Sequence, residues 1–286
     1  MNINDVKEIG VVGGGQMGSG IAQIVATAGY PVTFCDVSNE AAEKGKLGIE
    51  KKLAKDAAKG KISTDEAEAI AGRITPSADF QALANVDVVF EAIFEKMEVK
   101  KEFYSKIDAI CKPECVFCTN TSGLSITEIA SVTKRSDKFI GTHFFFPVPV
   151  MKLLEIIRGY DTGEETYQLA LALGAKIGKT TITVNEAPLF AVNRILIPML
   201  NEAMFVLQEG IASREDIDTG MKLGTNHPVG PLELSDMVGL DTLLMVMETL
   251  YNETRDSKYR PCTLLVKMVR AGHYGVKTGK GFYEYK

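Results

Sequence analysis

A glycine-rich turn near the N-terminus limits the fold of this chain more than any other feature. Gly13, Gly15 and Gly18 follow an apolar segment at residues 6–12 and open a helical segment at residues 17–28. In a dinucleotide-binding βαβ unit the first glycine permits a tight turn, and the second lets the backbone approach a pyrophosphate. The third lets the helix pack closely on the strand. We therefore predict that the N-terminal part of the chain is a Rossmann-type domain.

The second predicted strand, residues 31–36, ends at Asp36. A carboxylate at this point accepts hydrogen bonds from the ribose hydroxyls of NAD and repels the additional phosphate of NADP. No arginine stands in the three residues that follow. We predict NAD as the cofactor, with its phosphates at the helix N-terminus beside Gln16 and Met17. An ordinary glycine-rich turn is the alternative, because the chain has 26 glycines.

Strands and helices alternate through the N-terminal two thirds of the chain, which is the pattern of a doubly wound sheet. Ser38 and Ser63 are expected to cap two helices that form an insertion at about residues 38–72. Apolar segments predict further strands at residues 86–92, 115–119, 151–157 and 180–184. Another predicted strand ends at residue 143.

Only helical segments follow, beginning with one long apolar helix expected at residues 188–208. A helix without a clean polar face is usually buried, either inside a domain or against a second chain. The prediction is an α/β fold in which a Rossmann-type doubly wound sheet (residues 1–184) precedes a smaller all-α domain (residues 185–286).

The composition excludes several classes of partner. A net charge of -5 argues against non-specific nucleic-acid binding, which depends on a basic patch. The N-terminus lacks the basic start and apolar middle of a signal peptide. No uncharged apolar run approaches the ~18 residues that a membrane helix needs. We expect a cytoplasmic protein that binds neither nucleic acid nor membrane.

Five cysteines are an odd number, which does not suggest a disulfide framework. Three of them, Cys111, Cys115 and Cys118, have the three-then-two spacing of some iron–sulfur sites. Cluster ligands need an open loop, whereas these residues are expected to end a helix and enter a strand. Buried, unreactive thiols and no metal are the prediction, with an iron–sulfur cluster as the alternative.

His143 is one of only three histidines, and it ends an apolar segment. Glu155 follows within a second apolar segment twelve residues later. A carboxylate that holds a histidine in one tautomer is the usual arrangement of a general base. Beside a redox cofactor, this pair indicates a dehydrogenase, although a purely structural pair is the alternative.

Several further segments carry a resemblance to a known family. They are Glu95–Lys100, Asn120–Gly123, His143–Glu155, Pro188–Arg194, His227–Leu234 and Gly279–Tyr283. With the glycine-rich turn, they make the chain resemble the L-3-hydroxyacyl-CoA dehydrogenases over its whole length, most of all the short bacterial 3-hydroxybutyryl-CoA dehydrogenases. The resemblance implies NAD-dependent interconversion of (S)-3-hydroxyacyl-CoA and 3-ketoacyl-CoA. It also implies a homodimer that pairs through the helical domain.

The resemblance implies a role for each matching residue. His143 would take the proton of the substrate hydroxyl, and Glu155 would hold its imidazole ring. Ser122 would bind the reacting oxygen near the nicotinamide, and Asn193 would hold a substrate oxygen. The remaining matches would lie near the cofactor: Glu95, Lys100, Asn120 and Lys277. Ser122 can also cap the following helix, and surface positions are the alternative for Glu95, Lys100 and Lys277.

Coenzyme A carries several phosphates, so a thioester substrate needs cations. The helix after Ser38 is rich in lysine, and the resemblance implies Lys52 and Lys59 as the CoA contacts. A solvated helix face whose charge is partly balanced by Glu43 and Glu50 is the alternative interpretation.

Three positions depart from the family pattern. Phe146 stands in place of an asparagine, Leu189 in place of a glycine, and Gly123 in place of a second serine. These changes retune the pocket for another acyl chain or reduce activity. Two other functions therefore stay open: a dehydrogenase of a free hydroxy or sugar acid, and a non-catalytic NAD-binding protein.

Overall fold

The computed structural model describes residues 1–285 and divides into two compact units, Met1–Ala187 and Pro188–Lys286. The division falls three residues after the predicted boundary, because the last strand of the sheet continues to Asn185. Among the described residues, none of the helices has the length and apolar character required to cross a bilayer.

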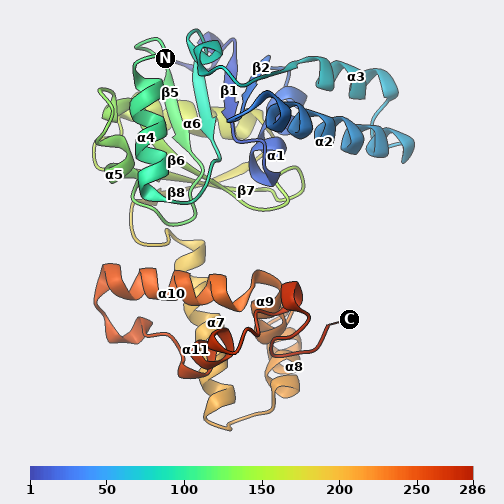
Figure 1. The fold of residues 1–286 in the computed structure, drawn as a ribbon, viewed down its shortest axis with the longest axis vertical. Coiled ribbons are helices and arrows are strands. Elements are labelled where there is room, and N and C mark those ends of the chain that lie inside the picture. The colour runs from blue at the N-terminus through green and yellow to red at the C-terminus, as the bar shows by residue number, and fades with distance from the viewer. Residues whose placement is uncertain (286) are drawn as a thin grey trace. The chain divides into compact units, whose positions relative to one another are not determined.

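The first unit is built on one eight-stranded sheet (Figure 1) with the strand order β3-β2-β1-β4-β5-β6-β7-β8. All neighbouring strands are parallel except β6 and β7, so the predicted Rossmann-type doubly wound fold is confirmed. The strands are β1 (Ile9–Val12), β2 (Val32–Cys35), β3 (Ile74–Ser77), β4 (Val88–Glu91), β5 (Val116–Thr119), β6 (Phe139–Phe144), β7 (Leu153–Arg158) and β8 (Thr180–Asn185).

Helices cover both faces of the sheet, which is why its central strands are apolar runs without alternation. All residues of β1, β2, β4 and β5 are buried. One face packs against α1 (Gln16–Thr27) and α6 (Glu164–Lys176) in the main apolar core. Beyond that core, Tyr104 of α4 (Met97–Asp108) stacks edge-on against Phe139 of β6, and α5 (Ile126–Ala130) contacts the same strand.

Two features of the sheet differ from the prediction. The edge strand β3 was not predicted, because Pro76 interrupts its apolar pattern; an edge strand tolerates proline, since one side of it has no partner strand. The strand β7 runs antiparallel to β6. Only residues 145–152 connect the two strands, and a parallel crossover needs a dozen residues or more.

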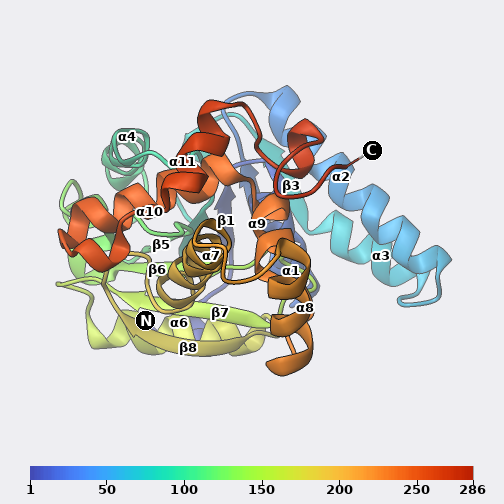
Figure 2. The same cartoon turned by 90° about the horizontal axis from the view of Figure 1, so that it is seen from below.

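The segment predicted as a helical insertion contains the pair α2 (Asn39–Ala58) and α3 (Thr64–Gly72). Ser38 accepts a hydrogen bond from the backbone of Ala41, and Ser63 accepts one from Glu66, as expected for N-caps. Figures 1 and 2 show this helix pair extending away from the edge of the sheet.

The second unit is helical, as predicted, with its own apolar core. Its first helix begins at Val192, four residues later than expected, because Leu189 and Phe190 have φ angles of 62° and 58°. These left-handed conformations cannot continue a right-handed helix. The helices are α7 (Val192–Gln208), α8 (Arg214–Gly224), α9 (Pro231–Val238), α10 (Leu240–Thr254) and α11 (Thr263–Arg270).

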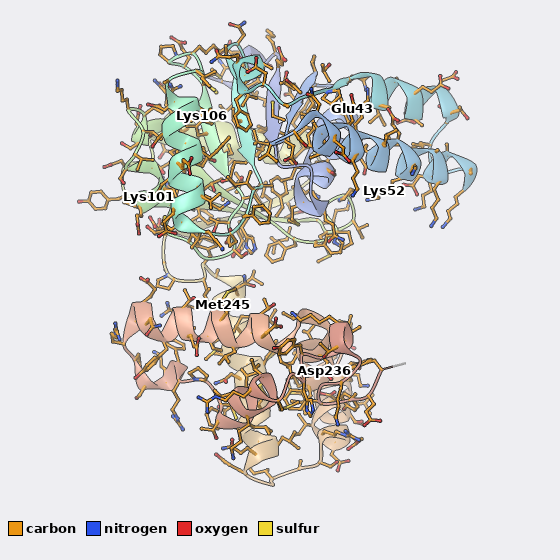
Figure 3. The ribbon with its side chains drawn as sticks, viewed as in Figure 1. Glu43, Lys52, Lys101, Lys106, Asp236 and Met245 are labelled. Atoms are coloured by element: carbon orange, nitrogen blue, oxygen red, sulfur yellow. The ribbon has the colours of Figure 1, made fainter. Side chains whose placement is uncertain are left out.

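Asp236 anchors the C-terminal motif within the second unit (Figure 3). Its fully buried carboxylate accepts hydrogen bonds from the backbone N–H groups of Phe282 and Tyr283, both at 2.9 Å, and from the Tyr285 hydroxyl at 3.0 Å. A Cβ atom on Gly281 would lie 1.9 Å from a carboxylate oxygen of Asp236. The Gly279–Tyr283 match therefore has a structural explanation.

All five cysteines are buried, as predicted. Cys118 lies in β5, and burial raises the pKa of its thiol. Cys111 differs, because a hydrogen bond with Cys115 lowers its pKa. Within residues 1–285, no cluster of three histidine, cysteine or acidic side chains is arranged to hold a metal ion.

Candidate active site

The glycine-rich turn connects β1 to α1 with the geometry that a dinucleotide requires. Gly13 has a φ angle of 108°, and a Cβ atom there would lie 2.5 Å from the carbonyl oxygen of Ala92. A Cβ atom on Gly18 would lie 1.8 Å from the carbonyl oxygen of Gly13. Gly15 is the exposed N-cap of α1, with open space beside it. The turn therefore fits a pyrophosphate against the helix N-terminus, with Gln16 and Met17 in the first helical turn.

Asp36 follows β2 and is held beside this turn. One carboxylate oxygen accepts the N–H of Gly14 at 2.5 Å, and the other accepts the N–H of Val37 at 2.6 Å. These bonds fix the carboxylate at the carboxyl edge of the sheet, next to the start of α1. A ribose held by Asp36 would therefore lie next to phosphates held at the turn.

A groove of about 640 Å³ adjoins the turn. Lys44 and Lys52 of α2 line it, and Figure 3 labels Lys52 on that helix. Lys59 is the exposed C-cap of α2 and is not among the lining residues. The other wall is the loop between β6 and β7, through Phe146, Pro147, Val148 and Pro149.

His143 and Glu155 lie directly opposite each other in the antiparallel pair β6–β7. The Nδ1 atom of His143 is 2.6 Å from a carboxylate oxygen of Glu155. Glu155 is fully buried, and 7% of His143 is exposed. Because Nδ1 is engaged by the carboxylate, the orientation of the imidazole ring is fixed.

Asn120 and Ser122 follow β5, the strand next to β6. The Asn120 side-chain oxygen accepts the backbone N–H of Phe144 at 3.0 Å, one residue beyond His143. The backbone N–H of Ser122 donates to Glu95 at 2.6 Å, and Ser122 is exposed at this edge. The structure thus connects the Asn120–Ser122 segment to the strand that carries His143.

Lys100 is fully buried rather than part of a solvated surface. Its ammonium group lies 2.5 Å from Glu91 and 3.6 Å from Glu95. Sequence reasoning missed Glu91, although an acidic residue that ends an apolar strand is a signal for a buried partner. It also missed Lys179, whose ammonium group donates to the carbonyl oxygens of Val148 and, at 2.7 Å, Met151.

Asn193 and Lys277 lie in the second unit. Asn193 is the second residue of α7. Lys277 forms an ion pair at 2.5 Å with Asp241, which sequence reasoning also missed. The predicted contacts of these two residues with substrate and cofactor stay predictions.

The three departures from the family pattern differ in environment. Phe146 is 58% exposed and lines the groove. Leu189 is buried in the apolar core of the second unit, in a left-handed conformation that favours glycine. Gly123 donates its backbone N–H to Thr121 at 3.3 Å.

Both units match known protein families. Residues 8–187 match the NAD binding domain of 3-hydroxyacyl-CoA dehydrogenase, and residues 190–285 match its C-terminal domain. A probable 3-hydroxybutyryl-CoA dehydrogenase of Bacillus subtilis is 51% identical over 99% of this chain and 98% of its own length.

More distant relatives and a solved structure agree with this assignment. The human mitochondrial hydroxyacyl-coenzyme A dehydrogenase is 40% identical over 98% of this chain and 92% of its own length. The crystal structure of (S)-3-hydroxybutyryl-CoA dehydrogenase from Ralstonia eutropha superimposes with a TM-score of 0.97 and 47% identity, covering 99% of this chain and 100% of that one. The chain therefore belongs to the 3-hydroxyacyl-CoA dehydrogenase family of NAD-dependent oxidoreductases that act on CH–OH groups.

Proposed function

We propose that this enzyme interconverts (S)-3-hydroxybutyryl-CoA and acetoacetyl-CoA, with His143 and Glu155 as its acid–base pair. The observation that carries the proposal is the buried 2.6 Å contact between His143 and Glu155, on the strand next to the Asn120–Ser122 segment. The names of the Bacillus and Ralstonia relatives support the four-carbon substrate.

In this mechanism NAD, when bound, would supply the acceptor for the hydride that leaves C3 of the hydroxyacyl group. His143 takes the hydroxyl proton at Nε2, and Glu155 stabilises the imidazolium that results. The Ser122 hydroxyl donates a hydrogen bond to the reacting oxygen, and the Asn193 amide holds a substrate oxygen in place. Glu95, Asn120 and Lys277 would hold the nicotinamide half of the cofactor, and Gly13, Gly15, Gly18 and Asp36 its ADP half.

The first test is NADH oxidation with acetoacetyl-CoA, followed by absorbance. The wild type should turn over the substrate, and His143→Gln should lower kcat by about 10²- to 10⁴-fold, because a positioned general acid contributes that much. NADH should bind equally well to both proteins. An inactive wild type that still binds NADH, or a fully active His143→Gln variant, would contradict the proposal.

The CoA contacts can be tested on α2. Lys52→Ala combined with Lys59→Ala should raise the KM for acetoacetyl-CoA about tenfold and leave kcat unchanged, because phosphate binding is the same in the ground and transition states. Since Lys52 lines the groove and Lys59 does not, Lys52→Ala should account for most of the effect.

Two controls accompany this experiment. Lys55→Ala changes an exposed lysine of the same helix and should leave KM unchanged. Acetoacetyl-N-acetylcysteamine carries no phosphates, so its KM should be equal in all variants. A KM for acetoacetyl-CoA that does not change in the double variant would remove α2 from the substrate site.

Of the three positions that depart from the family pattern, Phe146 is the easiest to test by substitution. Its exposed ring can be replaced with little loss of packing. Phe146→Asn should raise kcat for acetoacetyl-CoA about three- to tenfold, the value of one hydrogen bond formed in the transition state. Tyr160→Asn, at an exposed aromatic residue after β7, is the control. Equal turnover in Phe146→Asn and the wild type would show that the departure is neutral.

We also propose that the protein is a homodimer paired through its second unit. Large apolar side chains are exposed there, namely Ile195, Ile211, Leu223, Met237 and Met245. Pairing of the second unit with its copy would remove such side chains from water. Light scattering at micromolar concentration should give twice the mass of one chain, and a monomeric mass would contradict the proposal.

A further inference from the structure

A buried ion pair lies beside Glu95 and Asn120, two residues proposed to hold the nicotinamide half of the cofactor. Glu91 ends β4 and Lys100 lies in the first turn of α4, and both side chains are fully buried. Taking two charges out of water carries a large desolvation cost that offsets their attraction, so such a pair contributes little net stability. The pair is therefore better explained by the geometry that it imposes on its neighbours.

Glu91 connects three segments at the carboxyl edge of the sheet. One carboxylate oxygen accepts from Lys100 at 2.5 Å and from the backbone N–H of Ile93 at 2.8 Å. The other oxygen accepts from the Thr119 hydroxyl at 2.6 Å. Glu91 thus joins the ends of β4 and β5 to the start of α4.

Lys100 and Glu95 continue the network to Ser122. The Lys100 ammonium group donates to the carbonyl oxygen of Asn120 at 3.4 Å and lies 3.6 Å from one carboxylate oxygen of Glu95. The other oxygen of Glu95 accepts from the Thr121 hydroxyl and from the backbone N–H of Ser122, both at 2.6 Å. The position of the Ser122 backbone therefore depends on Glu95, and that of Glu95 on the buried cation.

We propose that Glu91 and Lys100 are positioning residues that act on the reaction through Glu95 and the Ser122 segment. The proposal rests on the proposed role of Ser122. A buried charged side chain with fixed partners has few alternative orientations. Such a side chain can therefore fix the position of a loop to within fractions of an ångström.

Three substitutions separate positioning from stability. Glu91→Gln keeps the shape of the side chain but removes its charge, and Lys100→Met keeps the length but removes the ammonium group. Thr119→Val removes only the hydroxyl that donates to Glu91. It is a milder change that tests the same network if the first two variants fail to fold. Lys101→Met is the matched control on the same helix (Figure 3), because Lys101 is partly exposed and pairs with Glu128 at 3.1 Å.

The kinetic readout is NADH oxidation with acetoacetyl-CoA. Glu91→Gln and Lys100→Met should each lower kcat about 10- to 100-fold, because a small misplacement of groups at the reacting centre has effects of that size. The KM for acetoacetyl-CoA should change less than threefold, and Lys101→Met should match the wild type. Unchanged kcat in folded Glu91→Gln and Lys100→Met would overturn the proposal.

Two measurements do not depend on turnover. Amide hydrogen exchange of the peptide covering residues 119–124 should accelerate about tenfold in Glu91→Gln, with peptides of the second unit unchanged. NADH, followed by its fluorescence, should bind about fivefold more weakly. Unchanged exchange and affinity would overturn the proposal even if the wild type were inactive with acetoacetyl-CoA, whereas that inactivity alone would contradict only the proposed function.

Discussion

The reversal of chain direction between β6 and β7 is the constraint on which the site depends. Because the eight residues of this connection are too few for a crossover, β7 returns beside β6 and places Glu155 opposite His143. The preceding strands β1, β4 and β5 are parallel to β6, so their carboxyl ends deliver the glycine-rich turn, Glu91 and the Asn120–Ser122 segment to the same edge. One short connection thus brings the His143–Glu155 pair to the edge where the glycine-rich turn lies.

Most of the fold could be predicted because its signals are local. The glycine spacing, the caps at Ser38 and Ser63, and the buried strands each depend on a few consecutive residues. What was missed depends on partners that are distant in sequence. The strand β3 forms against β2 despite Pro76, and the helix α7 starts late because core packing holds Leu189 in a conformation that its side chain disfavours.

In the candidate site, too, some contacts have a signal in the sequence and others depend on partners that only the fold brings together. The contact between His143 and Glu155 could be predicted, since both residues interrupt apolar segments and have complementary chemistry. The burial of Lys100 could not, because a lysine in an amphipathic helix usually faces solvent. Its partner Glu91 is recognisable in the sequence only as the last residue of a strand. No sequence pattern indicates that Glu91 forms an ion pair with Lys100, nine positions later. Long side chains reach their partners through the folded structure, so their contacts follow from the fold rather than from spacing.

The ammonium group of Lys179 has a consequence for the loop that carries Phe146. It binds the main-chain carbonyl oxygens of Val148 and Met151, and it makes no demand on the side chains of that loop. Every residue type supplies the same carbonyl group. At these two points the loop is therefore held through its main chain. The exposed side chain at position 146 can change without loss of these two bonds, and so without disturbing the connection that pairs His143 with Glu155.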